Sequence, residues 1–359
     1  MIKSIDILLS PNCNLKCSYC YQLNDAHDVA SSKTFHNQKG VAASAELIKR
    51  FVKFVLENEV TLVNFYGGEA LLQWPSIKLV VKEITQRSTN VRFMTVTNGT
   101  LLNEEKLDFI EQHNFNIILS LDGPKTRHDE YRGGFSNIAK CFSRLADLKS
   151  RVEVNIQVGG VRGLYEEAIK YVWSEGLKAI NVNIIENYNW YKEEDIESFG
   201  REYESALEGM LREEGIVKDA LKIYEYLKEP SYKKQCGITD GGLAMDWHGD
   251  FYPCIKGYEL GKGSAIGNIY SGLNRVLEKD VRSQAGSAYT SGSSRSHPYV
   301  AFCPVEVFKK HRTFHGKWNE EFSRMTELKT TLVAKLYYEI HSYLLKHKDD
   351  PYLADWTEA

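Results

Sequence analysis

Short runs rich in Val, Ile and Phe alternate with longer amphipathic windows from the N-terminus to about residue 186. The runs have the length and composition of β-strands and end in polar or turn-forming residues. Strands are expected at residues 5–9, 62–66, 92–97, 116–121, 152–158 and 179–185. Helices are expected between them, at residues 41–57, 76–87, 104–112, 135–148 and 164–175. In the first of these windows Leu47, Phe51, Phe54 and Val55 recur on one helical face.

The alternation of strands and helices defines the fold class. Parallel neighbours need crossover connections, so six β/α units predict a parallel sheet. Six units are too few to close an eight-stranded barrel. The expected fold is therefore α/β, an open, partial (β/α)6 barrel of the TIM type.

The pattern changes after residue 187. Residues 188–228 are mostly charged and helical in pattern, and we expect them to form a connection. Residues 243–254 have the pattern of a β-hairpin with a turn at His248-Gly249-Asp250. Residues 284–298 are rich in Ser and Gly and are expected to form a mobile loop, and residues 318–346 a closing helix. The expected domains are a barrel at 1–230, a small hairpin and helix domain at 231–320 and a C-terminal helix at 321–359.

The composition, 43% hydrophobic and 26% charged, is typical of a soluble globular protein. A net charge of -3 without a dominant basic run argues against a nucleic-acid or membrane partner. No segment has the apolar length of a membrane helix, and Asp6 interrupts the stretch that a signal peptide would need. These features predict a cytoplasmic protein, in which clustered cysteines indicate a metal site or catalysis before disulfides.

Three cysteines, Cys13, Cys17 and Cys20, follow the first expected strand with the spacing C-x3-C-x2-C. They therefore share one loop at the carboxyl edge of the sheet, where the reactive sites of β/α folds gather. Thiolates suit zinc or iron–sulfur clusters, and structural zinc sites normally have four protein ligands. Three thiols leave one metal position open, which fits a cluster with one iron bound by a non-protein group. The alternative is a zinc site completed by a distant residue such as His27 or His36.

This spacing, with the aromatic Tyr19 before the last cysteine, resembles the signature of the radical S-adenosylmethionine (SAM) superfamily. The resemblance implies that Cys13, Cys17 and Cys20 hold a [4Fe-4S] cluster whose open iron is chelated by the amino and carboxylate groups of SAM. It also implies that the cluster cleaves SAM to a 5'-deoxyadenosyl radical, which abstracts a hydrogen atom from the substrate. The fold of the family is a partial (β/α)6 barrel, in agreement with the strand pattern.

Gly67-Gly68-Glu69 follows the second expected strand and resembles the family's GGE motif, which binds the SAM amino group. Glycines allow a close approach of the backbone to a ligand, and a carboxylate can pair with an ammonium group. By itself the Gly-Gly-Glu motif is weak evidence for SAM binding, and the alternative is a plain turn that binds no ligand.

Further residues at strand ends resemble SAM contacts. Asn98 ends the third expected strand, and Ser120 and Asp122, at the end of the fourth, are similar to residues that contact the SAM ribose. Arg132 is similar to the arginine that pairs with the SAM carboxylate, with a structural salt bridge as the alternative. Tyr19 is expected near the adenine, with simple loop packing as the alternative.

Four further cysteines lie beyond the N-terminal loop. Cys141 falls within an amphipathic helical pattern and is expected in the core. Cys236, Cys254 and Cys303 resemble the C-terminal extension called SPASM or, in its shorter form, twitch, which holds auxiliary iron–sulfur clusters. The number of cysteines fits the twitch form, so the resemblance implies one auxiliary cluster.

Glu306 stands where a twitch extension has the second cysteine of a C-x2-C pair. Glu306 could ligate iron, His297 or His311 could do so, or one iron could stay open to substrate. The remaining alternatives are a structural zinc site and three unligated cysteines.

Radical SAM enzymes with this extension mostly modify peptides, so the resemblance implies oxidative modification or crosslinking of a ribosomally made peptide. No leader-binding domain is expected before the first strand, so the peptide leader would be recognised by the barrel, by residues 188–228 or by a separate leader-binding protein. An electron donor such as flavodoxin or ferredoxin is a further implied partner. Glu186, Asp246 and Lys256 are the candidates for the base that such a reaction needs.

Two other reactions and one other class of protein stay open. The enzyme could oxidise a small molecule or a sulfatase residue, although sulfatase maturases typically have Asp where Ile255 follows the hairpin cysteine. A zinc-binding interaction protein would hold zinc at the cysteines and would not bind SAM.

Overall fold

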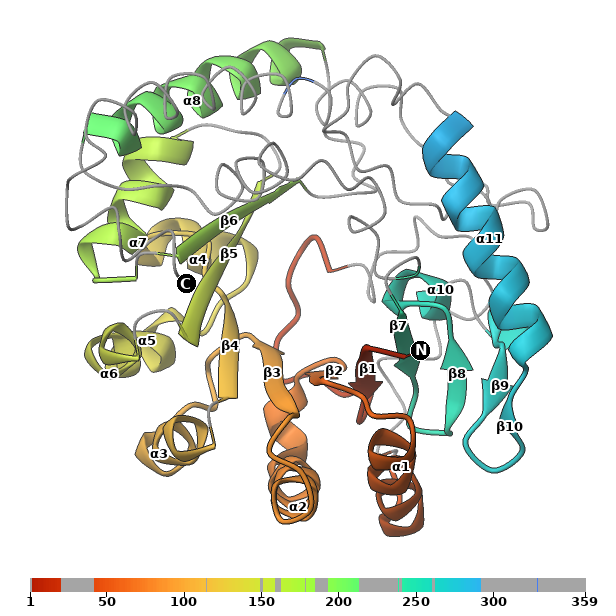
Figure 1. Cartoon of the computed structure of the whole chain (residues 1–359). Helices are drawn as coiled ribbons and strands as arrows, with labels where there is room; N and C mark the ends of the chain where they lie inside the picture. Colours follow the sequence, from red (N-terminus) through yellow and green to blue (C-terminus); the bar gives the residue numbers. More distant parts are fainter. Residues whose placement is uncertain are drawn as a thin grey trace, which may run out of the picture.

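The computed structural model describes residues 2–20, 42–113, 115–148, 151–158, 163–177, 179–184, 193–212, 238, 241–259, 262–291 and 328. Its strands form one sheet in the order β10-β9-β8-β7-β1-β2-β3-β4-β5-β6. The strands are β1 (Ser4–Leu8), β2 (Leu62–Tyr66), β3 (Arg92–Thr97), β4 (Phe115–Ser120), β5 (Val152–Val158), β6 (Ala179–Ile184), β7 (Gly242–Met245), β8 (Asp250–Tyr252), β9 (Gly267–Asn268) and β10 (Gly272–Leu273). The run from β7 to β6 is parallel, and β8, β9 and β10 continue it in antiparallel pairing. Among the described strands β6 and β10 are the two edges, so this is an open arc (Figure 1).

Helices α1 (Ala45–Glu57), α2 (Trp74–Thr85) and α3 (Glu104–Gln112) lie on the convex side of this arc (Figure 1). The other helices are α4 (Lys125–Tyr131), α5 (Phe135–Ile138), α6 (Phe142–Asp147), α7 (Lys170–Ser174), α8 (Glu193–Arg212), α10 (Ile255–Glu259) and α11 (Arg275–Ser291). Tyr258 of α10 clusters with Leu8 and Ala244, which face the concave side. A π-helical segment, Leu164–Ile169, precedes α7. The α/β partial barrel expected from the sequence is confirmed.

Local sequence explains where the helices begin. The Ser44 hydroxyl caps α1 by accepting a hydrogen bond from the Leu47 backbone N–H at 3.1 Å. The Asn103 side chain caps α3 in the same way, accepting from the Lys106 N–H. In α1 the apolar spacing has the expected result, because Leu47, Phe51 and Val55 are buried against the sheet.

Alternation along the strands separates an apolar outer face from a polar inner face. Ile5 and Ile7 of β1 pack into the core beneath the helices, where Phe65 stacks on Phe93 and Phe115. Residues of the opposite parity point to the concave side. Many of these are polar: Asp6, Asn64, Asn116, Ser120, Glu153, Asn155, Gln157, Asn181 and Asn183.

Two expected elements differ from the structure. The helix expected at residues 135–148 is divided by a 3-10 turn, Ala139–Cys141, where the buried Cys141 thiol contacts the Leu102 carbonyl. The loop expected at residues 284–298 is wrong for residues 284–291, which continue helix α11. The Asn274 side chain caps that helix at the Leu277 N–H, and once a first turn has formed each added residue extends it at little cost. The Ser and Gly residues of this segment indicated a loop, but the helix extends through them to Ser291.

The C-terminal hairpin is continuous with the barrel sheet. Strand β7 pairs in parallel with β1, from Ser4 opposite Gly242 to Ile7 opposite Met245, and β8 folds back beside β7. The domain boundaries at 230 and 320, and the closing helix at 318–346, fall largely outside the described residues and stay predictions.

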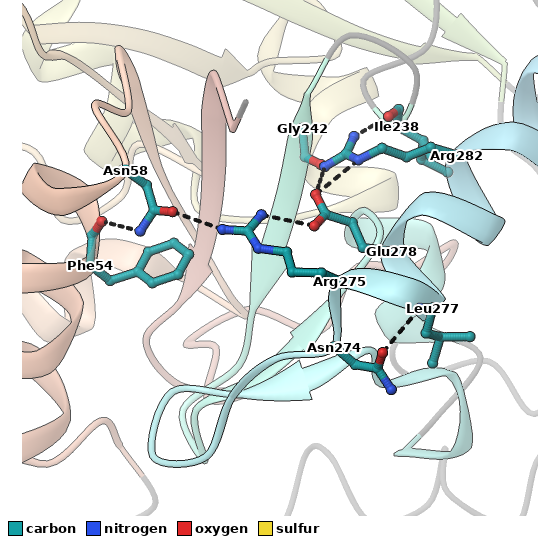
Figure 2. Close-up of polar contacts among 9 residues, drawn as sticks. All are labelled: Phe54, Asn58, Ile238, Gly242, Asn274, Arg275, Leu277, Glu278 and Arg282. Carbon is teal, nitrogen blue, oxygen red and sulfur yellow. Dashed lines mark hydrogen bonds and ion pairs between the residues drawn. The ribbon is translucent and has the colours of Figure 1, made fainter.

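Helix α11 is fastened to the barrel by an arginine–glutamate cluster (Figure 2). Arg282 donates to the Ile238 and Gly242 carbonyls, and it pairs with the buried Glu278 at 2.9 Å. Arg275 donates to Glu278 and to the Asn58 side chain at the end of α1. These contacts join the start of β7, the end of α1 and the first turns of α11 (Figure 2).

Candidate functional site

The cluster loop, residues 9–20, leaves β1 and enters the concave side of the sheet (Figure 1). It carries Cys13, Cys17 and Cys20, which are half-buried and free of disulfide bonds. Backbone hydrogen bonds fix its course, from the Ser18 N–H to the Tyr131 carbonyl at 2.8 Å and from the Cys20 N–H to the Cys17 carbonyl at 3.1 Å. The three thiols expected to act together therefore lie in one ordered loop over the strand ends.

The thiols form an electrostatically coupled set. The pKa of Cys13 is raised to about 11, mainly by burial and to a smaller extent by the negative charge of Glu69, Cys17 and Cys20, while the Leu15 N–H opposes the rise. Burial also raises the pKa of Cys17, against the opposing effect of Arg132. Iron binding to these sulfurs therefore displaces protons.

The donor set suits a multi-iron cluster better than a single ion. Among the described residues, no group of three or more His, Cys, Asp or Glu side chains is close enough to share one metal ion. A structural zinc ion lies about 2.3 Å from each sulfur ligand, which requires a tight cage. Three spaced thiols fit a [4Fe-4S] cluster, in which each cysteine binds a different iron.

Gly67 and Gly68 are required by the path of the cluster loop. Gly67 has φ +142°, and a Cβ there would lie 2.4 Å from the Ser10 carbonyl oxygen. A Cβ on Gly68 would lie 2.3 Å from the Asn12 carbonyl oxygen. The Gly68 N–H donates to Ser10 at 3.1 Å and the Glu69 N–H to Asn12 at 2.8 Å. The two glycines thus let the end of β2 support the cluster loop directly.

Glu69 is buried and joins the ends of β2 and β3. One carboxylate oxygen accepts from the Leu71 N–H at 3.0 Å and the Thr97 hydroxyl at 2.7 Å, and the other from the Asn98 N–H at 2.8 Å. Burial raises the pKa of Glu69 more strongly than these hydrogen bonds lower it. The carboxylate is therefore held beneath Cys13, and its role toward the SAM amino group stays a prediction.

Asn98 connects β3 to the cluster loop through its side chain. Its Nδ2 donates to Asn14 Oδ1 at 2.9 Å and contacts Cys13 Sγ at 3.8 Å, and its Oδ1 accepts from the Thr100 hydroxyl at 2.7 Å. The structure thus places Asn98 beside the first cysteine.

Asp122 is the centre of a second network. Its Oδ2 accepts from the Tyr19 hydroxyl and from Arg132 Nε at 2.8 Å, and its Oδ1 accepts from the Gln157 N–H at 2.9 Å. Its own N–H donates to Nδ1 of the buried His128 at 3.2 Å. These contacts tie the cluster loop to the ends of β4 and β5. Contact of Asp122 with a ribose stays a prediction.

Arg132 forms the structural salt bridge that the sequence left as an alternative. The ion pair with Asp122 is buried, with side-chain exposures of 8% and 1%, and the guanidinium lies 5.0 Å from the Tyr19 ring centroid. Burial alone would lower the pKa of Arg132, but Asp122 outweighs it and the pKa rises. Burial also raises the pKa of Tyr19 well above its ordinary value, so both groups keep their protons. Pairing of Arg132 with a SAM carboxylate stays a prediction.

Of the three expected bases, the structure describes the side chain of Asp246. Asp246 follows β7 and organises the hairpin turn, accepting from the His248 and Asp250 N–H groups and the Tyr252 hydroxyl. Burial raises its pKa. Lys256 lies in α10 without a described side chain, and Glu186 lies outside the described residues.

Of the expected auxiliary ligands, the structure describes Cys254. It is half-buried between β8 and α10, and its sulfur accepts from the Gly257 N–H at 3.4 Å. Cys236, Cys303 and Glu306 lie outside the described residues, as do His297 and His311. The auxiliary cluster therefore stays a prediction.

Several residues of the site were not identified from the sequence. Thr97 donates to the Glu69 carboxylate, His128 accepts from the Asp122 backbone N–H, and Asn14 links the cluster loop to Asn98. Thr97 could have been found as the hydroxyl next to Asn98 at a strand end. Asp6 had a clearer signal, because it is an acid in the middle of the apolar run Ile5-Asp6-Ile7-Leu8.

The fold is an open α/β barrel with a three-cysteine loop after its first strand, an arrangement that suits an iron–sulfur cluster. Residues 7–184 match the Radical SAM superfamily, and through this domain the chain belongs to that superfamily. Members of the superfamily use a [4Fe-4S] cluster and SAM.

The chain is similar to several curated proteins. It is 33% identical to a cysteine-type anaerobic sulfatase-maturating enzyme of Clostridium novyi (strain NT) over 171 residues, 43% of this chain and 43% of that protein. It is 24% identical to the antilisterial bacteriocin subtilosin biosynthesis protein AlbA of Bacillus subtilis (strain 168) over 273 residues, 73% of this chain and 56% of that protein. The matched regions thus span roughly half of these two relatives.

The fold also matches a solved structure over nearly its whole length. Native anSMEcpe with bound AdoMet has a TM-score of 0.71 and 16% sequence identity, covering 93% of this chain and 99% of that one. The same fold has been solved with bound AdoMet and a Cp18Cys peptide, with a TM-score of 0.71 and 17% identity. At this identity the likeness is one of fold.

Proposed function

We propose that this chain cleaves SAM to a 5'-deoxyadenosyl radical, which abstracts hydrogen from a ribosomally made peptide and leads to its oxidative modification or crosslinking. The observation that carries the proposal is the position of Cys13, Cys17 and Cys20. They lie in one loop of a radical SAM domain, over the strand ends, and Gly67 and Gly68 support that loop from below.

When bound, the [4Fe-4S] cluster supplies the electron and the open iron for SAM cleavage. The chain's own residues prepare the site. Glu69 is an acceptor for the SAM amino group and is fixed in place by Thr97 and the Asn98 N–H. Ser120, buried at the end of β4, is a hydroxyl for the ribose. The Tyr19–Asp122–Arg132 network closes the site beside Cys17 and places a cation there for a carboxylate.

A peptide substrate is supported by what the relatives are named for. The relatives at 33% and 24% identity are named for sulfatase maturation and for subtilosin biosynthesis. A structure of the same fold has also been solved with a bound Cp18Cys peptide. Sulfatase-maturase-like oxidation is the second candidate and is favoured by the first of these relatives, although Ile255 stands where such enzymes typically have Asp.

The remaining parts of the proposal concern the product and the partners. Loss of an electron from a substrate radical calls for an acceptor, and an auxiliary cluster bound by Cys236, Cys254 and Cys303, with Glu306 as a further candidate ligand, would serve. Flavodoxin or ferredoxin would reduce the N-terminal cluster, and a separate protein would present the peptide leader. Among the described residues no helix is long and apolar enough to cross a bilayer. The proposed location is the cytoplasm.

The experiment is anaerobic reconstitution with iron and sulfide, followed by reduction with dithionite in the presence of SAM. We expect absorption near 400 nm and formation of 5'-deoxyadenosine. Changing Cys13, Cys17 and Cys20 together to Ala should abolish both while circular dichroism shows a folded chain. Cys141→Ala is the matched control, because this cysteine lies in the core away from the loop, and it should retain both signals. Zinc in place of iron, or unchanged 5'-deoxyadenosine formation in the triple variant, would contradict the proposal.

A further inference from the structure

Asp6 is a charged residue in the middle of an apolar strand. Its neighbours Ile5 and Ile7 are fully buried in the core beneath the helices. Asp6 has the opposite parity, so its carboxylate faces the concave side of the sheet, where it is partly exposed. The SAM site described above does not use this carboxylate.

Asn64 lies beside Asp6 on the next strand and leaves one polar atom without a partner. The two residues are in register, and Asn64 Nδ2 donates to Asp6 Oδ1 at 3.0 Å. Asn64 is only 6% exposed, and its Oδ1 is buried without a hydrogen-bond partner. The pair therefore presents a buried amide oxygen and a carboxylate that each have unused capacity to accept hydrogen bonds.

Among the described residues, no cation pairs with Asp6. Ala244 is its register neighbour on β7, and Leu8, the next inward residue of β1, is fully buried. Burial raises the pKa of Asp6 to about 6, and the Asn64 hydrogen bond only partly offsets this. Arg92, at the start of β3 on the same face, is exposed, and no ion pair joins it to Asp6 in the described structure. A poorly solvated carboxylate that has no cation beside it in the described structure is unfavourable, so the arrangement suits a partner that brings one.

The chemistry of that partner follows from the two acceptors. They lie on neighbouring strands, and one of them is charged, which suits a group with two or more N–H donors and a positive charge. A divalent cation is a poor occupant, because calcium and magnesium take six or more oxygen ligands. The described residues also offer no group of three acidic, histidine or cysteine side chains for one ion.

We infer that Asp6 and Asn64 form a binding site inside the barrel for a cationic nitrogen of the substrate, an ammonium or guanidinium group. This inference rests on the proposed peptide substrate and adds that a lysine, an arginine or an N-terminal amine anchors it. Asp6 lies two residues before the end of β1, about 7 Å below the strand end that leads into the cluster loop. The anchored group thus lies on the inner wall, and the reacting carbon would lie above it toward Cys13.

The test is a titration of the reconstituted protein with small cations. The Asp6 carboxyl is followed by carbon-13 NMR of protein labelled at the aspartate carboxyl carbon, and Asp6→Asn identifies its resonance. Methylguanidinium and methylammonium, each at millimolar concentration, are the two cationic probes. Urea is the neutral control, because it has the same planar N–H donors as guanidinium without the charge. We expect at least one of the two cations to lower the pKa of Asp6 by one unit or more. The cation that lowers it more shows whether the site prefers a guanidinium group, as in arginine, or an ammonium group, as in lysine.

Two variants complete the design. Asn64→Ala removes the second acceptor and should weaken probe binding severalfold while Asp6 still titrates. Glu153→Gln removes another inward carboxylate, on β5, and should leave probe binding unchanged. Both variants, and Asp6→Asn, should retain the 400 nm absorption that reports an assembled cluster.

The outcomes separate this inference from the proposed function. A pKa of Asp6 that neither cation moves, or that urea moves equally, would show a self-contained structural pair and overturn the inference. Absence of 5'-deoxyadenosine from the unaltered protein would overturn the proposed function, whereas the Asp6 titration would still give its own answer. With both intact, Asp6→Asn should raise the KM for a basic peptide tenfold or more without reducing SAM cleavage in its absence.

Discussion

Arg132 Nε lies 2.8 Å from Asp122 Oδ2, and both side chains are buried. The pair joins the residue after α4 to the end of β4 and lies against Tyr19 of the cluster loop. Removing one partner of a buried ion pair leaves an uncompensated charge, which costs far more than the loss of a surface pair. The geometry of the cluster loop therefore depends on this ion pair.

Asp122→Asn should lower the free energy of unfolding by about 3–5 kcal/mol, because Arg132 stays buried without its carboxylate. Thermal unfolding under anaerobic conditions measures the change. Lys125→Ala is the control, since its ion pair with Asp129 is at the surface and should be worth at most about 1 kcal/mol. Equal losses in the two variants would show that the Asp122 pair is not structural.

Gly68→Ala should displace the cluster loop, because the new Cβ would lie 2.3 Å from the Asn12 carbonyl oxygen and 2.5 Å from that of Pro11. We expect the variant to fold but to bind far less iron after reconstitution, as measured by iron and sulfide content. Gly272→Ala is the control, because nothing lies within 4 Å of its new Cβ and the cost is limited to backbone strain at φ +95°. Full iron content in Gly68→Ala would show that cluster binding does not require the close approach of Gly68 to the cluster loop.

Glu69→Gln should weaken SAM binding tenfold or more. The amide removes the negative charge and presents N–H donors where the Leu71 and Asn98 N–H groups already donate. Equilibrium dialysis with labelled SAM on the reconstituted protein gives the affinity. Glu104→Gln, in the exposed first turn of α3, should bind SAM like the unaltered chain. An affinity unaffected by Glu69→Gln would remove Glu69 from the SAM site.

Asp6→Asn should stabilise the protein at alkaline pH. The pKa of Asp6 is raised from 3.8 to about 6, so the native state holds this proton more tightly than the unfolded state. Native stability is therefore lost as the pH rises from 3.8 to about 6 and is not regained above it. We expect Asp6→Asn to be more stable by up to ~3 kcal/mol at pH 8, at about 1.4 kcal/mol per unit, with the gain shrinking toward pH 4. Midpoints of thermal unfolding between pH 4.5 and pH 8 test this slope, and a pH-independent difference would contradict it.

Arg282→Ala should loosen helix α11, because it removes the Arg282 hydrogen bonds to the Ile238 and Gly242 carbonyls and one of the two arginines from Glu278 (Figure 2). The expected cost is about 1–3 kcal/mol, seen as faster hydrogen exchange in β7. Arg275→Ala is the matched variant, since Arg275 is 57% exposed and should matter less. The reverse order of effects would assign the fastening of α11 to its contact with α1.

The sequence predicted the parts of the fold that rest on local pattern. The bounds of β2, β3 and β5 follow directly from their Val, Ile and Phe runs, and the open barrel follows from the alternation. Pairing of β7 with β1 joins residues about 240 positions apart, and no local signal could indicate it. Helix α11 continues through residues 284–291 although this segment is rich in Ser and Gly, which favour loops. The Asn274 cap and the ion pairs of Glu278 stabilise the first turns of the helix, and these contacts could not be identified from the local sequence.

For the site, the sequence identified most of the groups but not their contacts. Gly67 and Gly68 were expected to approach a ligand, yet in the structure they approach the backbone of the cluster loop. Arg132 was expected to serve SAM, with the salt bridge as the alternative, and the structure shows it paired with Asp122. Such differences arise because hydrogen-bond partners are chosen in three dimensions, from strands far apart in the chain.

The pairing of β7 with β1 has a consequence for electron flow. Cys13 follows β1, and Cys254 follows β8, which is hydrogen-bonded to β7 in the same sheet. Redox centres built partly on these two cysteines would share one hydrogen-bonded sheet as their support. Within the described part of the chain, that sheet sets the spacing between the loops that carry the two cysteines, so an electron passing between such centres would cross a gap that the strand pairing defines.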